Sequence, residues 1–246
     1  MSHSGKIALI TGANKGIGFE IATKLGQQGV KVYVGARNPE RGEAAVQTLQ
    51  QLGINAEFIH IDLNDYRSIH IAAAHLTQSV GRLDILVNNA GILAPTDGVP
   101  SFTDINTVKQ TFNTDFFGTL VVTQAMLPLL KLAPSARIVN LSSGLGSLAL
   151  NEDPSWIYSD AKMIGYNASK AAVNMLTVQL AWELKNTSIK VNSANPNFTE
   201  SDLVPYGGGR PVQEGAKVAI DLALVGDDGP TGKFFEDLVT GEKVAW

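Results

Sequence analysis

The sequence predicts an α/β fold in which a single, doubly wound parallel sheet carries helices on both of its faces. Three observations support this prediction. Short apolar segments alternate with longer amphipathic segments along the chain. Some apolar segments are continuous, such as residues 7–10, as expected of strands that are buried on both faces. The intervals between them are long enough for helical crossovers, which join parallel strands.

Six segments are expected to be strands because they are short and apolar, and in chain order they are residues 6–11, 30–36, 54–61, 83–88, 136–141 and 189–194. The intervals between them are expected to be helices. Two of these helices, at residues 107–130 and 167–184, are long and strongly apolar. A final strand is expected after a turn formed by Asp227, Asp228 and Gly229.

Length and composition indicate one domain that comprises residues 1–246, because 44% of the residues are hydrophobic and can form one large core. The formal charge of -4 gives no broad basic surface, so we expect neither nucleic acid nor an anionic membrane as a partner. No apolar stretch approaches the roughly 20 residues of a membrane helix, and no secretory signal is visible. A cytoplasmic protein is therefore expected.

The absence of cysteine excludes disulfides, zinc sites built from thiolates and cysteine nucleophiles. The four histidines form no HExxH motif and have no evident carboxylate partners. We therefore expect no metal site.

A glycine-rich turn follows the first expected strand and opens the first helix. Gly12, Gly16 and Gly18 would let the backbone approach a pyrophosphate at the helix N-terminus. The spacing is G-x-x-x-G-x-G, which by itself also fits an ordinary tight turn between a strand and a helix. The context favours a dinucleotide site, whose expected contacts in this turn are Gly12, Asn14, Lys15, Gly16, Ile17 and Gly18.

The end of the second expected strand indicates which dinucleotide would bind. An NAD enzyme would place an acid there to bind the ribose hydroxyls, but this chain has Arg37. Arg37 and Lys15 could pair with the 2′-phosphate of NADP(H), or both could be solvated surface cations. Asp62, which follows the third strand, could accept a hydrogen bond from the adenine amino group or cap the helix that begins near Tyr66.

Tyr166 and Lys170 are four residues apart in an expected helix and therefore lie on the same face. The ammonium of Lys170 would favour the ionised form of the Tyr166 phenol, whose unperturbed pKa is about 10. This pairing indicates a tyrosine acid or base in nicotinamide-dependent redox chemistry. Residues 197–211 contain three consecutive glycines and no periodicity, so they are expected to form a mobile substrate loop over this site.

Together these motifs resemble the short-chain dehydrogenase/reductase family over essentially the whole chain. The matching segments are the glycine-rich turn at residues 11–18, the Asn-Asn-Ala-Gly motif at residues 88–91, the serine strand at residues 140–143 and the YxxxK motif at residues 166–170. The resemblance implies a Rossmann-type fold. Lys15 and Arg37 match the NADP-preferring members of the family, including the carbonyl reductases.

The resemblance also implies a role for each residue of the site. Tyr166 would donate a proton to a substrate carbonyl oxygen, Ser143 would hydrogen-bond that oxygen, and Lys170 would hold the ribose hydroxyls and bias Tyr166. Ser142 would be a structural neighbour. In addition to the glycine-rich turn and Arg37, the expected cofactor contacts are Asp62, Leu63, Asn89, Ala90, Gly91, Tyr166, Lys170, Pro196, Thr199 and Ser201.

Asp115 is the first departure from the family pattern, because the family has an asparagine there that supports a water relay to the lysine. We include Asp115 among the catalytic residues. Its charge would partly offset the effect of Lys170 on Tyr166, unless Asp115 is protonated or faces away. Asn113 lies two residues earlier and would point to another side of the helix, so it is not the equivalent residue.

The second departure is in residues 195–201, where the family usually has a Pro-Gly pair and a threonine at the position of Ser201. Thr199 through its backbone and Ser201 through its hydroxyl are the expected contacts to the nicotinamide carboxamide.

The third departure is an insertion, residues 147–156, between Ser143 and Tyr166. With the residues that follow, it creates a competing YxxxK motif from Tyr158 to Lys162. A strongly helical apolar run follows Lys170 and favours Tyr166 as the matching tyrosine. Tyr158 and Trp156 would line the substrate pocket or pack beneath a loop.

The resemblance thus implies an NADPH-dependent carbonyl reductase that reduces a ketone or an aldehyde to an alcohol by hydride transfer. A small-molecule carbonyl compound is the expected substrate. Two alternatives stay open: a non-catalytic NADP(H)-binding regulatory module, and an alcohol dehydrogenase that works in the oxidative direction. The two long apolar helices could pair in a homo-oligomer, as such helices often do in this family, or belong to the core.

Overall fold

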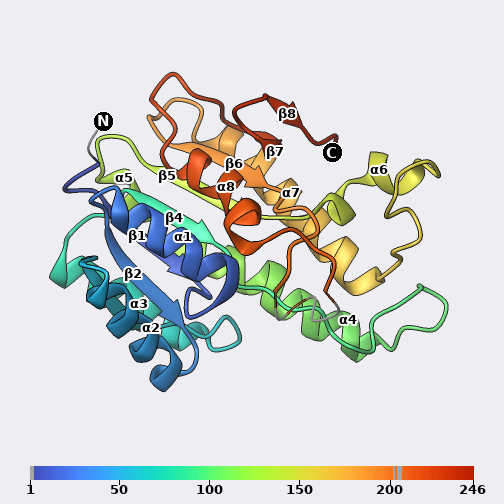
Figure 1. The fold of residues 1–246 in the computed structure, drawn as a ribbon, viewed down its shortest axis with the longest axis horizontal. Helices are drawn as coiled ribbons and strands as arrows, with labels where there is room; N and C mark the ends of the chain where they lie inside the picture. The colour runs from blue at the N-terminus through green and yellow to red at the C-terminus, as the bar shows by residue number, and fades with distance from the viewer. Residues whose placement is uncertain (1–2, 202, 204–206) are drawn as a thin grey trace.

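The structure, a computed structural model, describes residues 3–201, 203 and 207–246. These residues form an eight-stranded sheet with helices on both faces, which confirms the predicted doubly wound fold (Figure 1). The strand order is β3-β2-β1-β4-β5-β6-β7-β8, and only β8 is antiparallel to its neighbour among these described strands. The order reverses between β1 and β4, and sheets of this kind bind ligands beyond the strand ends at such a reversal.

The six strands predicted within residues 6–194 are all present, and each begins one or two residues later than expected. The strands are β1 (Ile7–Thr11), β2 (Lys31–Ala36), β3 (Ala56–His60), β4 (Ile85–Asn88), β5 (Arg137–Leu141), β6 (Lys190–Ala194), β7 (Lys233–Asp237) and β8 (Glu242–Lys243). Strand β7 is the final strand that the sequence predicts. The additional strand β8 has two exposed, charged residues and so carries no apolar pattern.

Successive side chains of the buried strands point to opposite faces of the sheet, so the molecule has two hydrophobic cores, one on each face. In β1, Ala8 and Ile10 point to one face, whereas Leu9 points to the other. The first face is covered by α1 (Gly16–Gln27), α2 (Pro39–Gln51) and α8 (Val212–Ala223). The second face is covered by α3 (Tyr66–Ser79), α5 (Thr119–Lys131) and α7 (Ile164–Glu183). The carboxyl ends of the strands are therefore the open edge at which a ligand can enter.

The long helix predicted at residues 107–130 has an interruption. It begins as α4 (Ile105–Phe112), passes through the π-helical segment η1 (Asn113–Gly118) and continues as α5. Gly118 allows η1 to lie close to the loop after β3, because a Cβ on Gly118 would lie 2.7 Å from the carbonyl oxygen of Leu63. The π-helical segment contains Asp115, and such segments often occur at functional sites.

The segment between β5 and α7, which contains the insertion, forms two short elements and a series of turns, which extend to one end of the molecule (Figure 1). The elements are η2 (Gly144–Gly146) and α6 (Leu148–Glu152), and the Ser147 side chain caps α6 by accepting a hydrogen bond from the Leu150 amide at 3.1 Å. The competing motif from Tyr158 to Lys162 lies in the turns. Its two side chains are therefore not on one helical face, unlike those of Tyr166 and Lys170.

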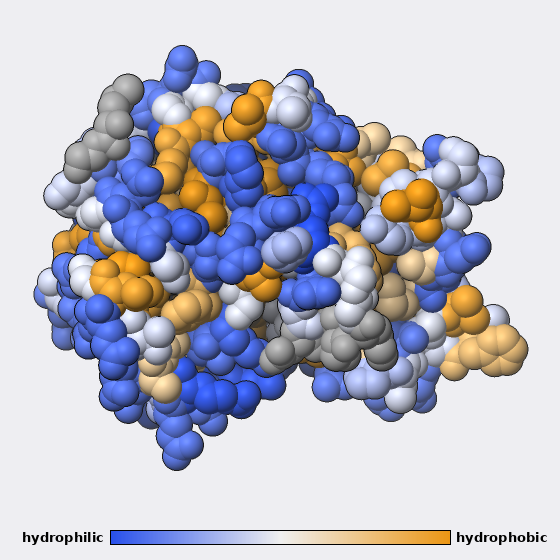
Figure 2. Space-filling model, in the orientation of Figure 1, coloured by the Kyte–Doolittle hydropathy of each residue, from blue (hydrophilic) through white to orange (hydrophobic). Residues whose placement is uncertain are grey.

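In the view of Figure 2, hydrophobic residues form several separate patches among hydrophilic ones. Met175, Val178 and Trp182 are exposed on α7, at the spacing of one helical face. The homo-oligomer stays a prediction. Within the described ranges, no helix is both long and apolar enough to cross a membrane, and no cluster of three potential metal ligands is present.

Candidate active site

A cleft of about 660 Å³ lies beyond the carboxyl ends of β1 and β4, where the strand order reverses. Its wall comes from the turn after β1, the loops after β2, β3 and β4, the end of β5, the start of α7 and the segment between β6 and α8. The cleft brings together most of the cofactor contacts expected from the sequence. They are Gly12, Asn14, Lys15, Gly16, Ile17, Gly18, Arg37, Asp62, Leu63, Asn89, Ala90, Gly91, Tyr166, Lys170, Pro196 and Ser201.

Hydrogen bonds to the loop after β4 fix the glycine-rich turn. The Asn89 side chain donates to the carbonyl oxygens of Thr11 at 2.8 Å and Gly12 at 3.2 Å. The backbone amides of Asn89 and Ala90 both donate to the Thr11 hydroxyl at 3.0 Å. Gly12 has a φ of +65°, and a Cβ at this position would lie 3.0 Å from the Cα of Ala90. A glycine is therefore needed where the two loops meet.

The turn fits a pyrophosphate. Gly16 has a φ of +56°, and a Cβ built on it would meet no heavy atom within 4 Å, so the backbone is accessible there. No side-chain hydrogen bond caps the start of α1, which leaves the first helical amides oriented to bind an anion. These features and the size of the cleft are compatible with the dinucleotide that the sequence predicts.

At the end of β2, the cleft contains a cation and no acid. Arg37 and Lys15 are both exposed, and both line the cleft. The next residue, Asn38, caps α2 by accepting a hydrogen bond from the Arg41 amide at 2.9 Å, so it is engaged in the fold. The charge at this end of the cleft suits a phosphate group rather than a free ribose diol.

Asp62 lies in the cleft but does not cap α3. Its carboxylate accepts a hydrogen bond from the Asn64 amide at 2.9 Å. The N-cap of α3 is Asp65, which accepts from the Arg67 amide at 3.1 Å. The capping alternative for Asp62 is therefore wrong, and its position beside Leu63 leaves it available to a ligand.

The first turns of α7 carry Tyr166 and Lys170 into the cleft. The Lys170 ammonium lies 5.5 Å from the centroid of the Tyr166 ring and donates a hydrogen bond to the Leu141 carbonyl oxygen at 3.2 Å. Ser143 follows β5, and its side chain lies near enough to the Tyr166 phenol to lower the pKa of that phenol. Ser143 and Tyr166 are therefore brought near each other although 22 residues separate them in the sequence.

Asp115 faces Lys170. One carboxylate oxygen of Asp115 lies 3.5 Å from the Lys170 ammonium, and both side chains are almost fully buried. The other oxygen accepts a hydrogen bond from the Ile92 amide at 2.8 Å. Asn113, by contrast, is exposed and lines a separate cavity. The helical position of Asp115 relative to Lys170 is the one expected from the sequence.

The three ionisable groups shift one another's pKa values. Burial raises the pKa of Asp115, and Lys170 and the Ile92 amide oppose this increase only in part. Burial alone would lower the pKa of Lys170, but the attraction of Asp115 and Tyr166 outweighs it, so that pKa is raised.

The pKa of Tyr166 is raised mainly by burial; Lys170 lowers it, Asp115 raises it and the hydrogen bond to Ser143 lowers it. The effect of Lys170 that the sequence predicts is present, but it is smaller than the effect of burial. In the protein alone, the pKa of Tyr166 therefore lies above its ordinary value.

Thr199 is the one expected cofactor contact that does not line the cleft. Its side chain is buried and donates to the Pro196 carbonyl oxygen at 2.7 Å, and it packs against Gly215 of α8. Of the substrate loop predicted at residues 197–211, residues 202 and 204–206 lie outside the described part of the chain.

Glu236 of β7 joins the two ends of this loop. Its carboxylate accepts hydrogen bonds from the side chains of Asn195 at 2.9 Å and of Asn197, and it lies 3.4 Å from the Arg210 guanidinium. Asn195 also accepts a hydrogen bond from the Gly144 amide at 3.1 Å, next to Ser143. Glu236 carries no signal in the sequence, because its partners are distant along the chain and form no motif.

Three aromatic rings cluster near Gly144. The rings of Trp156 and Tyr158 meet edge to face at 5.4 Å between centroids, and those of Tyr158 and Phe198 lie 6.0 Å apart. A Cβ on Gly144 would lie 3.1 Å from the Trp156 ring. Lys162 of the competing motif instead binds the Asn151 carbonyl oxygen at 3.0 Å, so its ammonium is engaged in the insertion.

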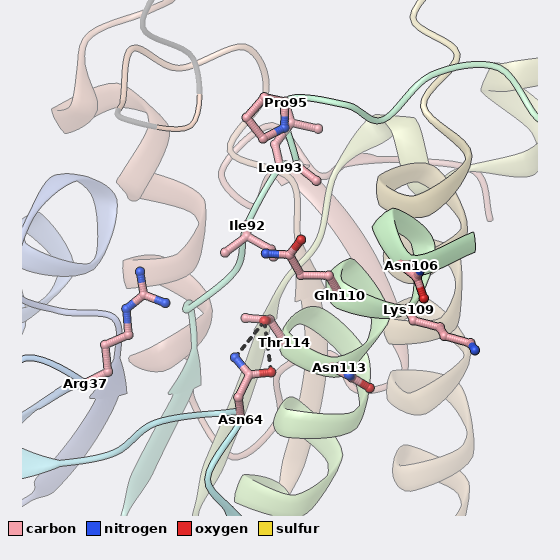
Figure 3. A pocket seen from close by; sticks show the side chains of 11 residues that line it. Arg37, Asn64, Ile92, Leu93, Pro95, Asn106, Lys109, Gln110, Asn113 and Thr114 are labelled. Carbon is pink, nitrogen blue, oxygen red and sulfur yellow. Dashed lines mark hydrogen bonds between the residues drawn. The ribbon is translucent and has the colours of Figure 1, made fainter. Parts of the chain in front are cut away.

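A second cavity, of about 650 Å³, adjoins the cleft at Arg37 and Asn64 (Figure 3). Asn64 pairs with the Thr114 hydroxyl at 3.0 Å, and the Gln110 side chain extends from α4 towards Ile92 (Figure 3). This cavity could not be predicted from the sequence, because uncharged polar residues on a helix surface carry no distinctive pattern.

Comparison with known proteins gives concordant matches. A family model described as short chain dehydrogenase matches residues 6–206. Carbonyl reductase [NADPH] 3 of Mus musculus is 34% identical, over 97% of this chain and 99% of that protein. The (-)-isopiperitenone reductase of Mentha piperita is 30% identical, over 96% of this chain and 97% of the reductase.

Solved structures are similar as well. The structure of salutaridine reductase from Papaver somniferum has a TM-score of 0.79 and 27% sequence identity, with 94% of this chain and 99% of that chain covered. The likeness thus includes nearly the full length of both chains.

Proposed function

The chain belongs to the short-chain dehydrogenase/reductase family, and from this premise we propose that it is an NADPH-dependent reductase that converts a ketone or an aldehyde into an alcohol. The observation that carries this proposal is the position of Tyr166 and Lys170 at one wall of the cleft, with Ser143 near enough to the Tyr166 phenol to lower its pKa. The similarity to a protein named as an NADPH carbonyl reductase supports the same reaction.

The preference for NADP(H) is supported by the charge of the cleft. Lys15 and Arg37 would bind the 2′-phosphate, and no acid at the end of β2 competes with it. The glycine-rich turn would hold the pyrophosphate, while Asp62 and Leu63 would contact the adenine. When bound, NADPH supplies the hydride that reduces the carbonyl carbon.

Tyr166 would donate its proton to the carbonyl oxygen as negative charge develops there, which completes the alcohol. Ser143 would hold that oxygen through its hydroxyl, and so stabilise the charge before the proton arrives. The raised pKa of Tyr166 keeps the phenol protonated, as a proton donor requires. Lys170 limits this increase and would bind the ribose hydroxyls of the cofactor.

The variant Tyr166→Phe tests this proposal, because it removes the proton donor and retains the ring. We expect turnover of a reducible carbonyl compound to fall by at least about two orders of magnitude, with the Kd for NADPH nearly unchanged. The measurements are NADPH consumption and cofactor titration by fluorescence. Undiminished turnover would contradict the assigned role of Tyr166.

An absence of turnover in the unchanged protein, together with firm NADPH binding, would instead favour a non-catalytic NADP(H)-binding module. The observation that favours this second candidate is the buried carboxylate of Asp115, which lies beside Lys170. Asp115 raises the pKa of Tyr166. Turnover in the oxidative direction alone would favour an alcohol dehydrogenase.

A further inference from the structure

Asp97 contacts the helix that carries Tyr166, although the two residues are 69 positions apart. One oxygen of its carboxylate accepts a hydrogen bond from the Tyr166 backbone amide at 2.8 Å. The other oxygen accepts from the Gly165 amide at 3.0 Å. These amides belong to the first turn of α7, where backbone N–H groups have no partner within the helix.

Helix α7 has no cap of its own. Its N-cap residue is Met163, whose side chain forms no capping hydrogen bond. In α3 and α4, the preceding aspartates Asp65 and Asp104 cap the helix locally. Asp97 therefore caps α7 from a distant loop, whereas a local residue caps α3 and α4. Its negative charge also interacts favourably with the positive end of the helix dipole.

The loop that carries Asp97 is itself held in place. The Asp97 carboxylate accepts a further hydrogen bond from the Gly98 amide at 2.9 Å, and the Asp97 amide donates to Ala94 at 3.0 Å. The hydroxyls of Thr96 and Thr107 are 2.8 Å apart, which ties the loop to α4. The Asp97 carboxylate is therefore a fixed acceptor.

Gly165 allows this contact to form. A Cβ on Gly165 would lie 2.9 Å from one carboxylate oxygen of Asp97, which is closer than a real Cβ atom comes to another heavy atom. The φ of Gly165 does not require a glycine, so the close approach of Asp97 is the reason for this residue.

The same loop begins in the cleft, which Gly91, Ile92 and Leu93 line, and ends at Asp97 and Gly98. The Ile164 amide also donates to the Gly98 carbonyl oxygen at 2.8 Å. The loop therefore spans the distance from the expected cofactor site to the first turn of α7.

We propose that Asp97 is a positioning residue for the reaction, which fixes Tyr166 relative to the cofactor by holding the first turn of α7 against the loop after β4. This inference rests on the proposed function. A small displacement of a proton donor such as Tyr166 from the reacting atoms lowers the rate of the chemical step strongly. Cofactor binding elsewhere in the cleft should not change.

The central experiment compares Asp97→Ala, Asp97→Asn and the control Asp104→Ala. Asp104 is the matched control, because it caps α4 through the Asn106 amide at 2.8 Å, whereas the hydrogen bonds of Asp97 are to the amides of α7. We expect Asp97→Ala to lower kcat at least about tenfold with the Kd for NADPH changed less than about twofold. Asp97→Asn retains one acceptor oxygen and should recover part of kcat, whereas Asp104→Ala should leave kcat unchanged.

Equal kcat values for Asp97→Ala and the unchanged protein would overturn the proposal. Equal losses in Asp97→Ala and Asp104→Ala would overturn it too, because they would reflect general destabilisation.

Gly165→Ala perturbs the same contact from the side of the helix. Alanine favours a helix over glycine, so the variant should not unfold more easily by loss of helix propensity. It should nevertheless lower kcat at least several-fold, because its methyl group displaces the Asp97 carboxylate. An unchanged kcat in Gly165→Ala would contradict the need for this contact.

Hydrogen exchange separates failure of this inference from failure of the proposed function, since it requires no turnover. The amides of Gly165 and Tyr166 should exchange at least about tenfold faster in Asp97→Ala than in Asp104→Ala. Unchanged exchange would overturn the inference whatever the activity. If the unchanged protein reduces no carbonyl compound but exchange accelerates as expected, the proposed function fails and the contact of Asp97 with α7 stands.

Discussion

The carboxylate of Asp115, 3.5 Å from the Lys170 ammonium, gives this site an additional buried acid at the position where related proteins are expected to have asparagine. Lys170 and Asp115 act on the Tyr166 phenol in opposite directions, the first lowering its pKa and the second raising it. At the residue scale, the site is therefore adjusted towards a tyrosine that keeps its proton. This suits proton donation in carbonyl reduction better than proton removal from an alcohol.

Asp115→Asn should lower the pKa of Tyr166, because it removes the anion that raises this pKa. Oxidation of an alcohol requires the ionised phenol, so its rate should reach half of its maximum at a lower pH in the variant. Rate profiles against pH measure this shift. The control is Asp104→Asn, at the start of α4, which should not shift the pH profile. An unchanged pH profile in Asp115→Asn would refute the electrostatic role of Asp115.

At the element scale, the structure explains how Asn197 replaces the glycine that the family pattern leads one to expect. Asn197 has a φ of 58°, and it is the only non-glycine residue with positive φ among the described residues. Asparagine tolerates this conformation better than most side chains. Its side chain also hydrogen-bonds Glu236, which a glycine could not do. The turn before the substrate loop is thus fixed by a side chain on β7.

Two variants of Asn197 separate these contributions. Asn197→Gly keeps the backbone conformation and loses the hydrogen bond to Glu236, so it should lower the free energy of unfolding by about 1–2 kcal/mol. Asn197→Ala also places an alanine at a positive φ, so it should lower the free energy of unfolding by about 1 kcal/mol more than Asn197→Gly does. Chemical denaturation measures both values. Equal stabilities of the two variants would contradict the backbone argument.

The sequence predicts elements better than it predicts contacts between them. The strands follow from continuous apolar segments, and the pairing of Tyr166 with Lys170 follows from a spacing of four residues in one helix. The π-helical segment around Asp115 was not predicted, because its apolar residues follow the same pattern as the helices on either side. Asp97 and Glu236 were not predicted because their partners come close only after the sheet has formed.

At the scale of the whole molecule, the end of the sheet opposite the cleft contains a buried arginine. Arg137, at the start of β5, is 2% exposed. Its guanidinium donates to the carbonyl oxygens of Val225 at 2.8 Å and Ala136 at 2.9 Å, and it pairs with Asp227 at 2.8 Å. This cluster connects the turn after α8 to the central sheet and is remote from the expected chemistry.

Arg137→Ala should lower the free energy of unfolding by about 3 kcal/mol, because it leaves buried carbonyl oxygens without donors and removes a packed side chain. The loss in Asp227→Ala should be smaller, since Asp227 is exposed. The measurements are thermal unfolding and kcat per folded molecule, and kcat should not change in either variant. If kcat fell in proportion to the free energy of unfolding, the cluster around Arg137 would not be independent of the active site.

NADPH-dependent carbonyl reduction is tested directly by the consumption of NADPH, with NADH in parallel, across a panel of aldehydes, aryl ketones and ketoesters. We expect turnover with a kcat/KM for NADPH at least about tenfold that for NADH, and loss of this preference in Arg37→Asp, which replaces the phosphate-binding cation with an acid. A preference for NADH in the unchanged protein would contradict the assignment of Lys15 and Arg37. Firm NADPH binding without turnover of any compound would contradict the reductase itself.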